Sequence, residues 1–319
     1  MGAKQWVVRQ VDQARQQALA QELAISPITA SVLLGRGIMT TDQARGWLSP
    51  TGAPQHDPFF LPQMEQAVDR LHRAVTGGER VCVYSDYDVD GVSAASLYVT
   101  WFGGLGASIH HYVPHRVREG YGLNIPALER LARQGVTLLV TADCGTTSVR
   151  EVEAANRLGL DVIVTDHHQV PADLPAALAI LNPHRPDSTY PFRGLCSAGL
   201  AYKVAQAYAA KFRVDDQALE PLLDLVALAT VADVVPLQEE NRVFVRHGLA
   251  LMERGARCGI RALKQGAGVR GPCTAGTVAF RLGPRINAAG RLDHADDAVR
   301  LLTTHSEVEA RTLAERLEQ

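Results

Sequence analysis

The sequence predicts an α/β fold: a doubly wound, mainly parallel sheet with a small N-terminal helical piece and a helical C-terminal part. Three observations support this class. Residues 1–50 carry apolar residues at helical spacing only. From about residue 64, short β-rich apolar runs alternate with amphipathic segments, which is typical of parallel βαβ units. The later third returns to mostly helical spacing.

An N-terminal helical region is expected over residues 1–55. Its helical spacing runs through "VVRQVDQARQQALAQELA", "ASVLLGRGI" and "TTDQARGWL", and "TTDQ" is typical of a helix start. The proline-rich stretch "SPTGAPQHDPFFLP" breaks this pattern and is expected to be a linker.

The main domain is expected over residues 56–300. Its strands are predicted at "RVCVYSD", "SIHHYVP", "VTLLVTAD", "DVIVTD" and "LAILNP". Helical segments separate them, and further helices follow in "SAGLAYKVAQAYAAKF", "PLLDLVALATVADVV" and "RVFVRHGLALMERG". Residues 301–319 form an amphipathic helix without a stop signal, so we expect them to begin a connection to a second domain absent from this chain.

Composition narrows the class of protein. With 319 residues, 46% hydrophobic and 21% charged, the chain is typical of a globular protein of about two domains. No apolar run is long enough to span a membrane, and "MGAKQWVVRQ" lacks the apolar core of a secretory signal, so a cytoplasmic location is expected. The five cysteines are scattered singly, which predicts reduced thiols and neither a disulfide framework nor a zinc site. A net charge of −2 requires any nucleic-acid contact to come from local basic patches.

Acidic and imidazole side chains gather where three predicted strands end. They are Asp86, Asp88 and Asp90 in "DYDVDG", Asp143 in "VTADCGT", and Asp166, His167 and His168 in "VTDHHQV". A calcium-binding EF-hand loop starting at Asp86 is excluded, because its twelfth position is Leu97 instead of glutamate and the preceding residues predict a strand. In parallel sheets, ligands bind outside the carboxyl ends of the strands. One such aspartate alone would usually be a helix cap, but so many together would repel one another unless cations neutralised them.

The ligand types point to the metal. Hard carboxylate oxygens with one or two imidazoles suit Mn²⁺ or Mg²⁺. Five or six ligands exceed the need of one ion, so we expect two ions about 3.5–4 Å apart. Such pairs hydrolyse phosphate esters, because they generate a nucleophile from water and stabilise the charge of the transition state.

These motifs resemble a known family. "DYDVDG", "TADCG", "TDHH" and "ALATVADVVPL" resemble the DHH phosphoesterase superfamily. "VPHRVREGYGL", "NPHRPDSTYPF", "GLAYKV", "VADVVPLQEENR" and "RLGPRINAAGRLDHA" are similar, in order and spacing, to its RecJ family of bacterial single-strand-specific 5′ to 3′ DNA exonucleases. The resemblance makes residues 56–300 the DHH catalytic domain and this chain a catalytic core fragment. It implies single-stranded DNA as substrate, mononucleotides as products and a role in DNA repair and recombination. It also suggests a single-stranded-DNA-binding protein and a helicase as partners, and no membrane.

The resemblance assigns roles to the strand-end residues. The expected metal ligands are Asp86, Asp88, Asp90, Asp143, His167 and Asp233, with Asp143 bridging the ions. His168 is expected either to bind metal or to hydrogen-bond the scissile phosphate. Asp166 is expected in the catalytic set as a residue that orients its neighbours.

Two basic stretches are expected to contact substrate. In "RLGPRINAAGR", Arg281, Arg285 and Arg291 lie among small residues, and the resemblance favours phosphate binding by Arg285 with Asn287 near the same group. The second stretch is "HRVREG", whose Arg116 and Arg118 are expected to contact the DNA strand, with Tyr121 either stacking on a base or packing. An exposed basic loop without function is the alternative for both stretches.

Two serines depart from the family pattern. Ser85 and Ser197 stand where glycine is expected, and neither is expected to touch a predicted ligand.

Three functions compete: a RecJ-type exonuclease, a DHH phosphoesterase acting on small phosphate esters or short oligonucleotides, and a catalytically silent replication scaffold. The scaffold is disfavoured because none of the expected ligands is missing. The regions "EGYGL" and "RINAAGR" and the N-terminal helical piece favour the exonuclease.

Overall fold

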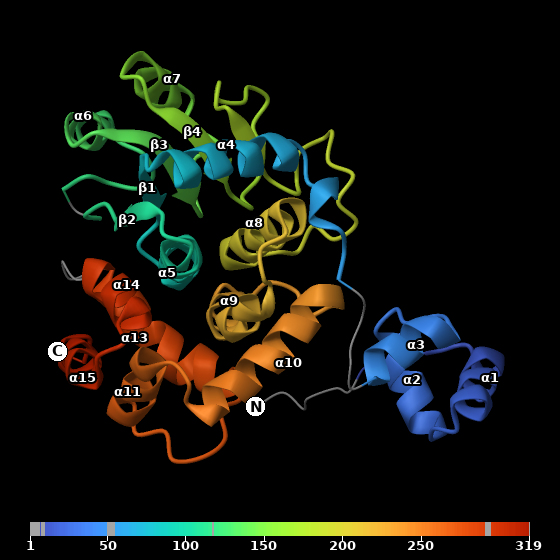
Figure 1. The fold of residues 1–319 in the computed structure, drawn as a ribbon. Coiled ribbons are helices and arrows are strands. Elements are labelled where there is room, and N and C mark those ends of the chain that lie inside the picture. The colour runs from blue at the N-terminus through green and yellow to red at the C-terminus, as the bar shows by residue number, and fades with distance from the viewer. Residues whose placement is uncertain (1–6, 8–9, 50–54, 117, 291–294, 319) are drawn as a thin grey trace, which may run out of the picture. The chain divides into compact units, whose positions relative to one another are not determined.

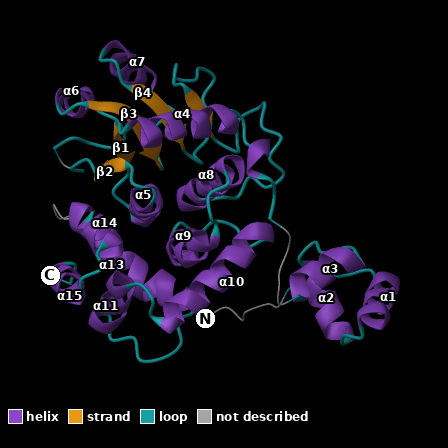
Figure 2. Ribbon diagram, in the orientation of Figure 1, coloured by secondary structure: helices purple, strands orange, loops and turns teal. Residues whose placement is uncertain are grey.

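The computed structural model describes residues 7, 10–49, 55–116, 118–290 and 295–318. The chain forms two compact units, Met1–Gln55 and His56–Gln319. The predicted fold class is confirmed: five parallel strands lie between helices, with helical regions before and after them (Figure 2).

The first unit is a small helical body. Its helices are α1 (Gln13–Leu23), α2 (Pro27–Gly35) and α3 (Thr41–Leu48). The predicted start of α3 carries a capping box: the Thr40 side chain accepts from the Gln43 backbone N–H, and the Gln43 side chain accepts from the Thr40 N–H. Among the described residues, no single helix is long and apolar enough to cross a membrane, although α1 and α2, bent by 118° at their junction, pass that test as a pair by length and composition.

The sheet of the second unit is parallel throughout. Its strands are β1 (Arg80–Ser85), β2 (Ser108–Tyr112), β3 (Val136–Ala142), β4 (Asp161–Thr165) and β5 (Ala179–Leu181). The strand order is β2-β1-β3-β4-β5, so the chain first winds outward from β1 to β2 and then in the opposite direction from β3 (Figure 1). The point between β1 and β3 is therefore the topological switch point, where doubly wound folds place their ligands.

Helices cover both faces of this sheet. Successive residues of β1 point to opposite faces: Val81 and Val83 belong to one buried cluster, Cys82 and Tyr84 to the other. The first cluster is completed by α4 (Met64–Gly77), α5 (Val89–Gly104) and α8 (Ser197–Phe212), and the second by α6 (Ile125–Arg133) and α7 (Val149–Arg157). Both faces are thus buried, which explains why the strands read as continuous apolar runs.

A helical region follows the sheet and packs on α5 and α8. Its elements are η2 (Gln217–Leu222), α9 (Leu223–Ala232), α10 (Glu239–Arg254), α11 (Cys258–Gly266), α12 (Ala275–Thr277), the π-helical η3 (Val278–Leu282), α13 (Gly283–Ala289), α14 (Ala295–Thr303) and α15 (Glu307–Arg316).

A buried ion pair joins α8 to α10. Lys203 Nζ lies 2.7 Å from Glu240 Oε2, and both side chains are completely buried. Lys203 also donates to the His56 carbonyl at 2.8 Å, and the Tyr190 hydroxyl donates to Glu240 Oε1. The pair is hydrogen-bonded on both sides, as buried charges require.

Candidate metal centre

The backbone brings three aspartates to one edge of the sheet. Asp86 follows β1, Asp143 follows β3 and Asp166 follows β4. Their N–H groups extend the parallel ladder by one step, donating to Ala142, Thr165 and Leu181 carbonyls at 3.0, 3.1 and 3.2 Å. The three side chains therefore start from the same level, at the carboxyl edge of the sheet beside the switch point.

The turn "DYDVDG" folds tightly onto the start of α5. Asp88 caps this helix, with Oδ1 accepting from the N–H groups of Asp90 and Gly91 at 2.9 and 3.1 Å. A Cβ at Gly91 would lie 2.6 Å from the Asp86 carbonyl oxygen, so only glycine allows this close approach. The turn thereby holds two carboxylates, Asp86 and Asp90, on either side of a capping carboxylate.

Asp143 has an unusual backbone. Its φ of +68° lies in the left-handed region, which side chains other than those of asparagine and aspartate rarely occupy. The N–H bond to Thr165 holds the residue in this conformation. Such backbone geometry is concentrated at functional sites.

His167 lies at the middle of the carboxylates. Its Nε2 is 3.1 Å from Asp143 Oδ1, 3.4 Å from Asp90 Oδ2 and 3.6 Å from Asp233 Oδ2. This nitrogen is buried, and none of the described residues gives it a hydrogen bond of acceptable geometry. A buried nitrogen aimed at three carboxylates fits a metal ligand.

The possible ligand atoms form overlapping groups. Within each group the atoms lie within 4.8 Å of one another. The groups are Asp86 with Asp88 and Asp143; Asp90 with His167 and Asp233; and Asp143 with His167 and His168. Asp143 and His167 each belong to two groups, so the structure joins all the expected ligands into one continuous centre. The donor set is oxygen-rich, which suits Mn²⁺ or Mg²⁺.

Burial and mutual repulsion disfavour the charged form of these carboxylates. Burial first, and then the charge of Asp88, raises the pKa of Asp86 to about 7. Burial and the charge of Asp90 raise the pKa of Asp233 to about 6, against a favourable effect of His167. Burial and neighbouring carboxylates hold the pKa of Asp143 well above its ordinary value. Divalent cations at the centre would remove this penalty.

We expect metal-free protein to lose stability relative to an Asp86→Asn variant as the pH rises from about 5 to about 7.5. The pKa of Asp86, about 7 in the folded protein, lies above that of the unfolded chain, so the folded state binds more protons in this range. The stability that this proton provides is lost as the pH rises through the folded pKa. Urea unfolding in EDTA at several pH values measures the difference, and a difference that does not change with pH would contradict this electrostatic account.

Asp166 orients His168. Asp166 Oδ1 lies 2.7 Å from His168 Nδ1 and also accepts from the His168 N–H, while Oδ2 accepts from the Thr146 N–H at 3.0 Å. Burial raises the pKa of Asp166, but these hydrogen bonds outweigh it and lower the pKa to about 2. The hydrogen bond to Asp166 raises the pKa of His168. Asn182 fixes the same segment by donating to the His168 carbonyl at 2.9 Å.

Sequence analysis missed the roles of two residues that support the candidate ligands, Asn182 and Ser197. Asn182 comes directly after β5, in the same strand-end position as the aspartates, and this position was the signal that could have identified it. The expectation that Ser197 touches no predicted ligand is wrong: its hydroxyl donates to Asp143 Oδ1 at 3.0 Å, and its N–H donates to Asp90 Oδ2 at 2.7 Å. The contact arises because α8 begins at the metal centre, which no local pattern reveals.

The loop after β2 places aromatic and cationic side chains beside the centre. The Tyr121 hydroxyl donates to the Asp143 carbonyl at 3.3 Å, and its half-exposed ring meets those of Tyr87 and His168 edge to face. The Arg116 guanidinium lies 5.0 Å from the centre of the Tyr87 ring. Arg118 is exposed in the same loop.

In the other basic stretch, "RLGPRINAAGR", some residues pack on the acidic turn and others bond away from it. Asn287 Oδ1 accepts from the Val89 N–H at 3.0 Å, so α13 packs directly on the acidic turn. A Cβ at Gly290 would collide with the Tyr87 carbonyl, which keeps this approach close. The two described arginines of the stretch, Arg281 and Arg285, bond to other groups.

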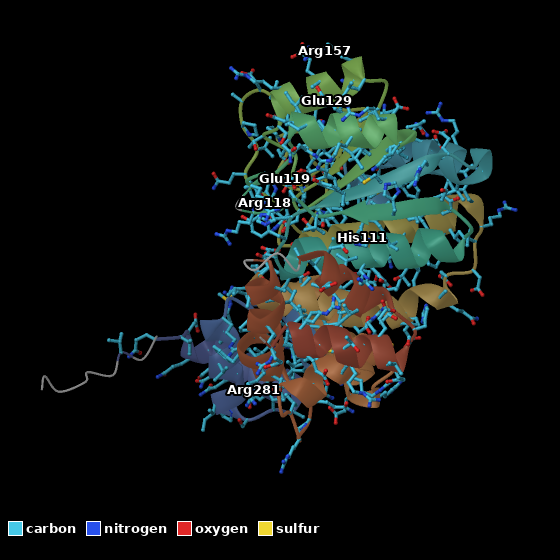
Figure 3. The ribbon with its side chains drawn as sticks, turned by 90° about the vertical axis from the view of Figure 1, so that its left-hand side faces the viewer. His111, Arg118, Glu119, Glu129, Arg157 and Arg281 are labelled. Atoms are coloured by element: carbon cyan, nitrogen blue, oxygen red, sulfur yellow. The ribbon has the colours of Figure 1, made fainter. Side chains whose placement is uncertain are left out.

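The Arg281 guanidinium donates to the Ala267 carbonyl, and Arg285 bonds to Glu318 and to the Arg281 carbonyl. Figure 3 shows Arg118 beside Glu119 and Arg281 well apart from both. Arg291 lies outside the described residues. Phosphate binding by these arginines stays a prediction.

The parallel sheet with a carboxylate and imidazole cluster at its switch point defines an α/β protein with a candidate metal site. Residues 80–230 match the family model described as the N-terminal domain of the DHH family. The chain belongs to the DHH family.

Within this family the chain is similar to RecJ. It is 39% identical over 315 residues to the single-stranded-DNA-specific exonuclease RecJ of Bacillus subtilis, a match that covers 98% of this chain and 39% of that protein. The crystal structure of RecJ from Thermus thermophilus in complex with Mn²⁺ superposes with a TM-score of 0.82 at 29% identity, covering 97% of this chain and 44% of that chain. The structure of RecJ from the same organism with Mg²⁺ gives a TM-score of 0.72 at 27% identity, covering 97% and 41%. The chain thus spans less than half the length of these relatives. The two solved structures of the Thermus thermophilus protein hold Mn²⁺ and Mg²⁺, respectively.

Proposed function

We propose that this chain is a metal-dependent exonuclease that hydrolyses single-stranded DNA from the 5′ end and releases mononucleotides. The observation that carries the proposal is the convergence of three carboxylates, the buried Asp90 and Asp143 and the half-buried Asp233, on His167 Nε2 at the switch point. The similarity to RecJ over 98% of the chain supports the choice of substrate.

The grouping of ligands favours two ions. One would be held by Asp90, His167 and Asp233, the other by Asp86 and Asp88, with Asp143 bridging both. When bound, the two ions would lower the pKa of a bound water. Their positive charge would also stabilise the negative charge on the transition-state phosphate.

His168 has a separate role in this proposal. The hydrogen bond between Asp166 and Nδ1 fixes the ring and favours its protonated form, which leaves Nε2 to donate to the scissile phosphate. Asp166 is then a positioning residue that acts through His168.

The loop after β2 would hold the DNA strand. Arg116 and Arg118 provide charge for the backbone, and Tyr121 provides a half-exposed aromatic face beside Asp143.

Replacing Tyr121 by alanine is expected to raise the KM for single-stranded DNA by roughly tenfold, because stacking of one base on an aromatic ring contributes about 1–3 kcal/mol. Tyr121→Phe keeps the ring and should remain near the wild-type KM. Steady-state kinetics on an oligonucleotide measures both variants, and an equal loss in the two would assign the effect to the hydroxyl instead of stacking.

The wider setting follows from the substrate. Residues 56–300 would be the catalytic domain, acting in DNA repair and recombination in the cytoplasm. A single-stranded-DNA-binding protein and a helicase are the proposed partners, because together they would provide single strands.

Product analysis of labelled oligonucleotides tests the proposal. With Mn²⁺, 5′-labelled single strands should release labelled mononucleotide at once, 3′-labelled strands should shorten stepwise, and blunt duplex should resist. If the protein cleaved only a dinucleotide and no longer strand, the assignment of single-stranded DNA as substrate would be wrong. The result would favour an enzyme that uses the same metal centre on small phosphate esters.

A further inference from the structure

We propose that Ser197 is a positioning residue of the metal centre: its hydroxyl sets the direction of the Asp143 carboxylate, while the start of α8 holds Asp90. The inference rests on the proposed function for its catalytic consequence, but its effect on metal binding can be measured without DNA.

Ser197 donates two hydrogen bonds to predicted ligands. Its Oγ donates to Asp143 Oδ1 at 3.0 Å, and its backbone N–H donates to Asp90 Oδ2 at 2.7 Å. The next N–H, of Ala198, donates to Asp90 Oδ1 at 2.8 Å. Ser197 is completely buried, so water does not compete for these bonds. One residue thus connects a carboxylate in the first turn of α5 with one that directly follows β3.

The start of α8 explains the hold on Asp90. The first N–H groups of a helix have no partner within the helix, and here the Asp90 carboxylate satisfies two of them. The residue before the helix, Cys196, makes no side-chain cap, so the carboxylate takes the place of the usual capping group. Asp90 is therefore fixed by backbone, which any residue at position 197 except proline would supply.

The hold on Asp143 depends on the side chain of Ser197 instead. Asp143 Oδ1 is also the oxygen 3.1 Å from His167 Nε2, and both residues belong to two of the ligand groups. A carboxylate oxygen has two lone pairs, so it can accept from a hydroxyl and still bind a cation. A neutral donor at this point fixes the oxygen without adding a charge that would compete with the metal.

Removing the hydroxyl should weaken metal binding selectively. Ser197→Ala leaves the backbone bonds to Asp90 but frees the Asp143 side chain, and loss of such an outer hydrogen bond lowers metal affinity by roughly 10–100-fold. Ser197→Thr keeps a hydroxyl and should bind metal more tightly than Ser197→Ala. The matched control is Ser96→Ala, since Ser96 is an equally buried serine, on α5, whose hydroxyl donates to the Val92 carbonyl of its own helix at 2.7 Å.

Titration of each metal-free protein with Mn²⁺, followed calorimetrically and by the electron paramagnetic resonance of free Mn²⁺, measures the affinity directly. The expected order of affinity is wild type and Ser96→Ala, then Ser197→Thr, then Ser197→Ala. At saturating Mn²⁺, any remaining loss in Ser197→Ala should appear in kcat and not in the KM for DNA, because the hydroxyl is completely buried.

Wild-type affinity in Ser197→Ala would overturn the inference. So would an equal loss in Ser96→Ala, which would make it a general effect of losing a buried hydroxyl, or a Ser197→Thr variant no better than Ser197→Ala. If the Mn²⁺ order holds but no variant degrades DNA, the proposed function fails and the positioning role stands.

Discussion

Replacing Asp143 by alanine is expected to abolish hydrolysis of single-stranded DNA while leaving the protein folded. Asp143 groups with Asp86 and Asp88, and its Oδ1 lies 3.1 Å from His167 Nε2 of the other ion's group, so it would bridge both ions and its loss should release the pair. We expect turnover to fall by about three orders of magnitude or more, roughly 4 kcal/mol of transition-state stabilisation. Steady-state rates on a labelled oligonucleotide with Mn²⁺ measure the loss.

The same position gives a second readout that separates catalysis from folding. Burial and neighbouring carboxylates raise the pKa of Asp143, so its charge opposes folding when no metal is bound. Asp143→Asn should therefore melt at a higher temperature than wild type in EDTA but lose the further stabilisation that Mn²⁺ gives to wild type. Asp69→Ala, which removes an exposed carboxylate paired with Lys211, is the activity control. Full activity in Asp143→Ala would contradict the assignment of this cluster as the catalytic metal centre.

The second large effect concerns stability. Glu240→Gln should destabilise the second unit by about 3–5 kcal/mol, because it leaves the Lys203 charge buried without a counter-charge. Both side chains are completely buried and 2.7 Å apart, so no solvent can replace the lost partner. Urea unfolding at constant pH measures the free energy of unfolding.

The double variant Lys203→Met with Glu240→Gln distinguishes the pair from its surroundings. It removes both charges and keeps an acceptor for the Tyr190 hydroxyl, so it should be closer to wild type than Glu240→Gln alone. Lys211→Met, at a partly exposed lysine paired with Asp69, should change stability little. Additive losses in the double variant would mean that the two charges do not compensate each other.

Local sequence patterns predicted the sheet and the place of the site. β-rich runs alternating with helical segments predicted parallel strands, and in parallel strands the carboxyl ends must lie at one edge. The aspartates after β1, β3 and β4 could therefore be placed together from the sequence alone. The capping box of α3 was also predictable, because Thr40 and Gln43 are three residues apart and interact within one helical turn.

Contacts between distant helices could not be predicted in this way. Ser197 reaches Asp143 because α8 starts at the metal centre, and Arg285 finds Glu318 because α13 and α15 belong to one helical region. Both outcomes depend on how helices pack, which the spacing of apolar residues does not encode. Asn182 is intermediate: its strand-end position was visible, but its donation to the His168 carbonyl was not.

Anomalous scattering at the manganese edge, from crystals of this chain grown with Mn²⁺, tests the central claim most directly. The account predicts two peaks about 3.5–4 Å apart. One should touch Asp90, His167 and Asp233, the other Asp86 and Asp88, with Asp143 between them. No peak at these residues under saturating Mn²⁺, or peaks held by other side chains, would contradict the account.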